Sequence, residues 1–305
     1  MAVYEHTYRP YTGEVTPLWS RFLIIPRHAF RSVFQSKLFL SFFIACLIYP
    51  LIAAIVIYLP HNESAKAIMN MTVGDLIPID AEFFYRFIAT QGFFGFFLNL
   101  LVGPPLISRD LSNNALPLYL SRPFSRAEYV IGKMSVIVIL LSIITWIPGL
   151  VLFLFQSYLE GRAWFTANLY LAGAIFVGSW VWILILALLS QAISAWVKWR
   201  IAASAALLGI FFIPSVFGEI LNNVFITRWG SLLSLRAVIN AVWSGLFGIF
   251  VRQTGHIQGT INGRDVNVVL LEPPLWMSWI VLSILAALCL VLIARKVRAY
   301  EVVRG

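Results

Sequence analysis

The chain has 305 residues, of which 60% are hydrophobic and only 11% are charged, and its formal net charge is +9. Soluble proteins average about 25% charged residues, so this composition excludes a soluble enzyme and a disordered chain and predicts a membrane protein. Excess Lys and Arg in a membrane protein marks its cytoplasmic loops, so the charge does not indicate nucleic-acid binding. Cys46 and Cys289 both lie in apolar runs, which predicts neither a disulfide nor a metal site.

The first 37 residues predict a cytoplasmic arm followed by an amphipathic helix. Between Leu18 and Val33, apolar residues recur about every fourth position with basic residues between them. Such a helix would lie along the inner membrane surface, and a plain basic anchor for the first span is the alternative. Because the first long apolar run begins only after this basic stretch, we expect a retained span and no cleaved signal peptide.

Six uncharged runs have the length that a membrane-spanning helix needs. None of them alternates between polar and apolar residues, which excludes a β-barrel and predicts an all-α polytopic protein. Residues 38–218 hold the first five spans, and residues 275–305 hold the sixth span and a cytoplasmic tail. The six runs are Leu38 to Leu59, Phe87 to Ile107, Met134 to Phe155, Leu169 to Ile193, Ile201 to Gly218, and Leu275 to Ala294.

The connection after the second span, residues 108–133, predicts a short cytoplasmic helix held between two breaks. Gly103 and the prolines at 104 and 105 loosen the inner end of the second span, and Ser108 is placed to cap a helix that begins at Arg109. Residues 121–123 then break this helix, and a capping box at 125–128 starts the helix that leads into the third span.

The fifth span contains small residues spaced four apart, which lets helix backbones approach closely. Ordinary packing inside one bundle and a self-association face are both open explanations. The residues are Ala202, Ala205, Ala206 and Gly209.

The long connection at residues 219–274 is too apolar between Leu232 and Val251 to be a plain solvated loop. It predicts a helix that dips into the outer interface, with a seventh spanning helix as the alternative, although about fifteen uncharged residues are short for a crossing. Asn262-Gly263 supplies the positive φ angles of a two-residue turn, which predicts a small external β-hairpin.

The charges predict the orientation of the spans. With the amino terminus inside, the inner segments hold fifteen Lys and Arg against five acids, and the outer segments hold seven against eight, which together give the 22 and 13 of the whole chain. The net charge is thus 15 − 5 = +10 inside and 7 − 8 = −1 outside. We therefore expect both termini in the cytoplasm.

Three short motifs of the inner connection, Arg109-Asp110, Leu120-Ser121-Arg122-Pro123 and Gly132-Lys133, carry a resemblance to a known family. The chain resembles the permeases of ATP-binding-cassette (ABC) transporters of the type 2 export class, and its amino-terminal arm is similar to that of many bacterial members. The resemblance implies a multi-pass protein of the bacterial inner membrane, in which two permeases pair with two ATPase subunits that bind ATP and Mg. It also implies that the short helix couples to the ATPase through Arg109, Asp110, Leu111, Asn114, Leu116, Leu118, Ser121, Arg122, Pro123 and Lys133.

Within that helix, Asp110 in the first turn would stabilise the helix through its dipole and would also pair with an ATPase cation. Leu116 and Leu118 would be buried in the partner's groove, and Arg122 and Lys133 would contact the partner or lipid phosphates. A connection whose basic residues only set topology is the alternative.

The chain itself has no phosphate-binding loop, because Ala127 and Met134 stand where the motif around Gly132-Lys133 needs Gly and Ser or Thr. We therefore expect no enzyme and no cofactor in this chain, with ATP hydrolysis on the partner. Uncharged spans suit a lipidic or amphipathic cargo, and mechanical transmission to an extracytoplasmic partner is the alternative. The other classes considered are a membrane enzyme, for which the scattered histidines offer no constellation, and a non-transporting anchor or assembly partner.

Overall fold

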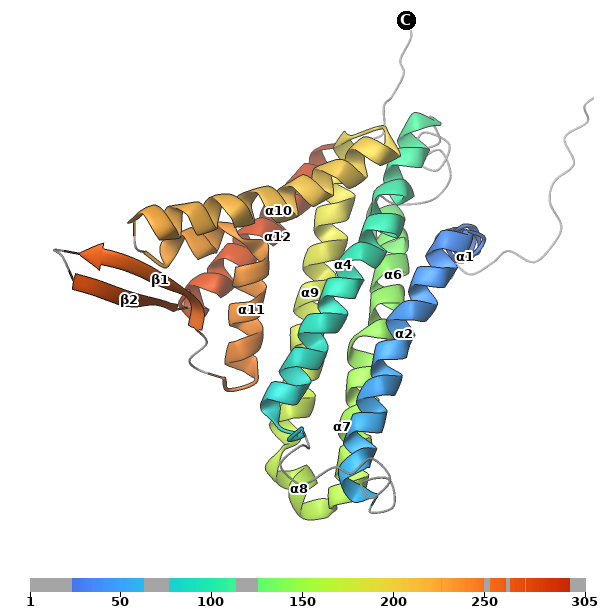
Figure 1. Cartoon of the computed structure of the whole chain (residues 1–305). Helices are drawn as coiled ribbons and strands as arrows, with labels where there is room; N and C mark the ends of the chain where they lie inside the picture. The colour runs from blue at the N-terminus through green and yellow to red at the C-terminus, as the bar shows by residue number, and fades with distance from the viewer. Residues whose placement is uncertain are drawn as a thin grey trace, which may run out of the picture.

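The computed structural model describes residues 24–62, 77–113, 126–225, 227–249, 253–261, 264–271 and 273–296. Over these residues the chain is a bundle of long helices (Figure 1). The predicted all-α polytopic class is confirmed, because six helical stretches in this part of the chain are long and apolar enough to cross a membrane. They are Lys37–His61, Ala81–Asp110, Ala127–Glu160, Leu169–Trp196, Arg200–Phe225 and Leu275–Lys296.

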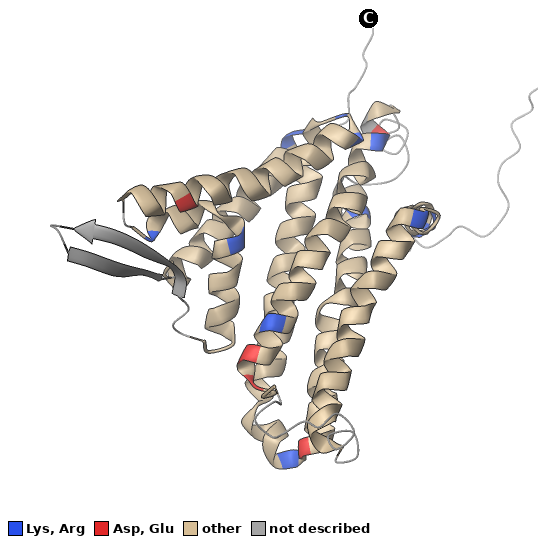
Figure 2. Cartoon of the chain, viewed as in Figure 1, with Lys and Arg blue, Asp and Glu red and all other residues tan. Residues whose placement is uncertain are grey.

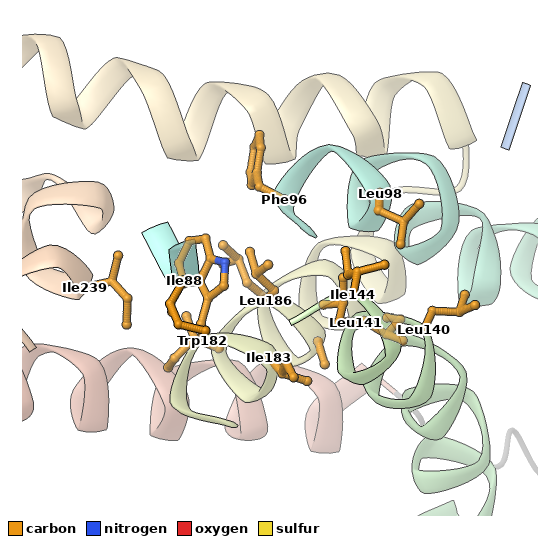
Figure 3. Packing of buried hydrophobic residues seen from close by; sticks show 14 of the residues in the cluster. Ile88, Phe96, Leu98, Leu140, Leu141, Ile144, Trp182, Ile183, Leu186 and Ile239 are labelled. Atoms are coloured by element: carbon orange, nitrogen blue, oxygen red, sulfur yellow. The ribbon is translucent and has the colours of Figure 1, made fainter. Parts of the chain in front are cut away.

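The centre of the bundle is made by α4 (Ala81–Ser112), α6 (Arg126–Ile144), α7 (Trp146–Glu160) and α9 (Leu169–Trp196). In the most apolar stretch of α4 and of α9, 61% of the residues are buried, against 22% in each of α2, α10 and α12. Figure 3 shows buried side chains from three of these helices in the core, among them Phe96 of α4, Leu141 of α6 and Leu186 of α9. The three outer helices, α2 (Lys37–Tyr58), α10 (Arg200–Phe225) and α12 (Leu275–Lys296), leave most of their apolar surface for lipid or for another chain.

One helix break lies inside the third span, between α6 and α7. Pro148 has no N–H for the carbonyl of Ile144, and Thr145 between the two helices has the non-helical angles φ −108° and ψ −92°. Pro50 and Pro214 lie inside uninterrupted helices. A proline in these spans is therefore tolerated, with a local break only at Thr145.

The amphipathic pattern at the amino-terminal side corresponds to α1 (Ile24–Phe34). Ile25 and Ala29 are buried against the bundle, whereas Arg27 and Arg31 are exposed. The part of the predicted arm and helix before residue 24 lies outside the described residues.

The two ends of the bundle differ in charge. We call the end that holds α1, the last turn of α4 and the turn from α9 to α10 the α1 end, and the opposite end, which holds η2 (Leu59–His61) and α8 (Arg162–Ala167), the α8 end. Figure 2 shows Lys and Arg gathered at the α1 end, with acids and bases mixed toward the α8 end. The cations at the α1 end include Arg27, Arg31, Lys37, Arg109, Lys133, Lys198, Arg200, Arg295 and Lys296.

The segment between α10 and α12 folds back into the bundle. After η4 (Trp229–Leu233), helix α11 (Leu235–Leu246) has 12 residues, about 18 Å at 1.5 Å per residue, which is too short to cross about 30 Å of hydrocarbon. The alternative of a seventh spanning helix is therefore wrong. Beyond α11, strands β1 (Gln253–Ile261) and β2 (Arg264–Leu271) pair antiparallel with Thr260 opposite Asp265. The predicted turn at Asn262 and Gly263 lies outside the described residues.

Candidate coupling site

An ion pair joins the two helices that lead into and out of the connection after the second span. The Asp110 carboxylate in the last turn of α4 lies 2.8 Å from Lys133 Nζ in α6, and the side chains are only 15% and 9% exposed. The Tyr129 hydroxyl donates to the same carboxylate oxygen, Oδ2, at 2.7 Å. Lys133 Nζ also lies 5.8 Å from the centre of the Tyr129 ring. The three side chains form what we call the 110–133 clamp, which holds both ends of the connection together.

The clamp depends on α4 continuing past its two prolines. Residues 104 and 105 have no N–H, so the carbonyls four residues before them lose their helical partners. The Ser204 hydroxyl of α10 donates to the Leu100 carbonyl at 3.3 Å. The Ser194 hydroxyl of α9 donates to the carbonyl of the first proline at 2.6 Å and accepts from the Ser108 N–H at 2.8 Å. Ser204 therefore takes over a bond that the helix backbone cannot make, and Ser194 bridges an N–H and a carbonyl one helical turn apart.

Helix α1 packs against α6 next to the clamp. A Cβ atom at Gly132 would lie 3.3 Å from Ile25 Cβ, so glycine allows α1 to approach α6 closely next to Lys133. The Gly-Lys pair thus has two local roles, since the glycine seats α1 and the lysine pairs with Asp110.

Two predictions about this region are wrong. Ser108 does not cap a new helix and no helix begins at Arg109, because α4 runs without interruption to Ser112 and the Ser108 hydroxyl donates back to the Pro104 carbonyl at 2.7 Å. The connection predicted at 108–133 is accordingly shorter, since its first residues belong to α4 and its last to α6.

Asp110 therefore lies in a last helical turn and not in a first one. A carboxylate is unfavourable at that end of the helix dipole, and the bonds from Lys133 and Tyr129 offset this cost. In the isolated chain Asp110 and Lys133 pair with each other. The expected roles of Asp110 toward an ATPase cation and of Lys133 toward a partner or lipid stay predictions.

The remaining predicted coupling residues are placed only in part. Arg109 is exposed at the α1 end, and Leu111 belongs to α4, although its side chain is not described. The other predicted residues lie outside the described residues: Asn114, Leu116, Leu118, Ser121, Arg122 and Pro123.

The small residues of α10 do not pack inside the bundle as a set. Ala202 and Ala205 are exposed, and Ala206 and Gly209 are half-buried. The nearest atom to a Cβ placed on Gly209, 3.5 Å away, belongs to Ile213 of the same helix. The buried face of α10 is a different one, formed by Ala203, Leu207, Phe211, Gly218 and Asn222.

No pattern in the sequence predicts the contacts that Trp243 of α11 makes inside the bundle. The Trp243 indole donates to the Gly178 carbonyl of α9 at 2.9 Å, and the Trp182 indole donates to the Gly92 carbonyl of α4 at 2.9 Å. The two indoles meet edge to face with centroids 5.9 Å apart. A Cβ at Gly92 would lie 2.5 Å from the Trp243 ring, so glycine is needed where the ring is seated.

The polar contacts of the described residues at this site join helices to one another. Among the described residues no group of three or more His, Cys, Asp or Glu side chains could hold a metal ion. The buried amides of Gln91 and Asn99 donate to the backbone carbonyls of Cys46 and Leu186 on neighbouring helices, and thus join helices together.

Comparison with models of known protein families gives no match, and comparison with curated proteins gives none. The class that the fold defines is a multi-pass helical protein, with six helical stretches able to span a membrane in the part of the chain that the structure describes.

Proposed function

We propose that this protein is the membrane-spanning permease subunit of an ATP-driven ABC transporter of the export class. Its connection between α4 and α6, residues 113–125, docks onto a separate ATPase subunit that binds ATP and Mg. The observation that supports this proposal most is the 110–133 clamp, because it joins both ends of the connection to two central helices. A push on the connection would therefore move α4 and α6 together.

The proposal assigns the docking contact to the leucines of the connection. Leu116 and Leu118 belong to a largely apolar stretch, residues 115–120, with asparagines before it and Ser121-Arg122 after it, and a groove on the ATPase would bury them. Burial of one leucine contributes roughly 1.5 to 3 kcal/mol. The proposal puts Arg109, which is exposed beside the clamp, next to the docked ATPase.

The same proposal fixes the orientation and the assembly. The α1 end faces the cytoplasm of a bacterial cell, which is supported by its excess of Lys and Arg over acids. Both termini are then cytoplasmic, and the strands β1 and β2 form a hairpin on the outer side. Two permeases associate through the small residues of α10, which is supported by the exposure of Ala202 and Ala205.

The test is the double substitution Leu116→Asp/Leu118→Asp in the full chain expressed with its ATPase. We expect membrane insertion to be intact, the ATPase to be lost on copurification, and permease-stimulated ATP hydrolysis to be abolished. The control Ser112→Asp/Asn113→Asp adds the same two charges at exposed positions where α4 ends and the connection begins, and it should retain the complex. If the leucine variant keeps a full complex and full activity, or if no ATPase copurifies with the parent protein, the chain belongs to another class, such as a membrane enzyme or an anchor.

A further inference from the structure

We propose that the α1 end carries a binding site for the phosphate headgroup of an anionic phospholipid. The site is a pocket of about 310 Å³ between the last turns of α4 and the start of α10. Its lining includes three cations, Arg109, Lys198 and Arg200, and no acid among the described residues. None of these three cations forms an ion pair with another described residue.

The local charges favour an anion in this pocket. Asp110, next to Arg109, is directed toward α6 and is bound by Lys133, so it does not neutralise the pocket. The first turn of α10 contains no acidic residue. The first N–H groups of that helix have no intrahelical acceptor and add to the positive potential beside Arg200.

The surroundings indicate a lipid as the source of the phosphate. At the rim of the pocket, Trp199 is 78% exposed and Ile201 is 76% exposed, as expected of side chains at a membrane interface. Leu101 belongs to the same helix as Ser108 and precedes it by seven residues, about 10 Å along the helix axis. Leu101 lines an apolar groove of about 500 Å³ together with Phe42 and Phe97.

A phospholipid would use both features, because its headgroup fits the cationic pocket and an acyl chain fits the apolar groove. A free phosphate ion would use the pocket alone. Basic pockets between membrane helices on the cytoplasmic side are a known way to bind anionic headgroups. This inference does not depend on the proposed transport function, since it requires only that the α1 end lie at a membrane surface.

The test counts phosphatidylglycerol molecules bound to the purified full chain in detergent by native mass spectrometry. We expect Arg109→Gln/Lys198→Gln/Arg200→Gln to weaken the tightest binding about a hundredfold, because each cation near a lipid phosphate contributes roughly fivefold. The control removes the same charge from exposed positions at the same end. It is Arg27→Gln/Arg31→Gln/Lys37→Gln, and it should change the affinity by less than about threefold.

Three results would overturn the site. They are equal loss in the control, equal binding of phosphatidylcholine to the parent protein, and displacement of phosphatidylglycerol by an equimolar amount of inorganic phosphate. The last result would assign the pocket to a free anion. If the triple variant does not fold, Lys198→Gln alone, in the turn between α9 and α10, should lose roughly fivefold in affinity, and an unchanged affinity would equally refute the site.

Discussion

The 110–133 clamp makes a quantitative prediction about stability. Lys133→Met removes the charge but keeps most of the apolar length of the side chain. Breaking a buried ion pair by removing one partner costs roughly 3 to 5 kcal/mol. Because Asp110 is 15% exposed and keeps its bond from Tyr129, we expect the lower end of this range, about 3 kcal/mol.

A double-mutant cycle separates the ion pair from other effects of these substitutions. Asp110→Asn should cost about 2 kcal/mol, since the amide oxygen still accepts from the Tyr129 hydroxyl. The double variant should cost about 3 kcal/mol and not the sum of about 5, because it leaves no unpaired charge. The interaction energy is then about 2 kcal/mol, within the range for side chains in contact.

The measurement is the free energy of unfolding by denaturant titration of each variant in mixed micelles, together with its Tm. Lys37→Met is the matched control, because Lys37 is an exposed lysine at the same end of the bundle. Strict additivity of the two single substitutions would refute the pairing. A loss for Lys133→Met no larger than that for the control would refute it as well.

Three further predictions concern the packing of the helices. Ser194→Ala should destabilise the protein by about 1 to 3 kcal/mol, because the buried Ser108 N–H loses its acceptor, while the Pro104 carbonyl keeps its bond from the Ser108 hydroxyl. Ser283→Ala at an exposed position should cost less than about 0.5 kcal/mol in the same titration. Gly92→Ala should lower Tm because the new methyl group clashes with the Trp243 indole, at a cost of about 1 to 3 kcal/mol. The control Gly173→Ala, where the methyl group meets nothing within 4 Å, should be neutral or stabilising. Equal effects of the two substitutions would contradict the packing of Trp243 against Gly92. Ala205→Cys, on a background lacking both native cysteines, should form a disulfide-linked dimer in membranes, and exclusively monomeric protein after oxidation would argue against the α10 interface.

Local features of the sequence were enough to define the spans and the charge asymmetry. A spanning helix satisfies its own backbone hydrogen bonds, so about 20 uncharged apolar residues indicate it whatever surrounds them. The six runs were found for this reason. The amphipathic period before the first span likewise anticipated the buried face of α1, with Ile25 and Ala29 on it.

The course of α4 was decided by tertiary contacts. Gly103 and the two prolines are local signals for a break, and they led to the wrong helix start at Arg109. The Ser204 hydroxyl of α10 supplies the bond that Leu100 lacks, although the two residues are 104 positions apart. The Ser194 hydroxyl of α9 bridges the turn that follows, although it is 86 positions from Ser108. No pattern along α4 contains that information.

The pairing at the coupling site has the same origin. The sequence motifs single out Asp110 and Lys133 separately, and the family resemblance implies an external partner for each. Their proximity follows only from the way in which α4 and α6 pack, which brings the two side chains to 2.8 Å and removes them from water. Composition and periodicity therefore determined which segments enter the membrane, whereas the approach of distant helices decided which polar groups satisfy one another there.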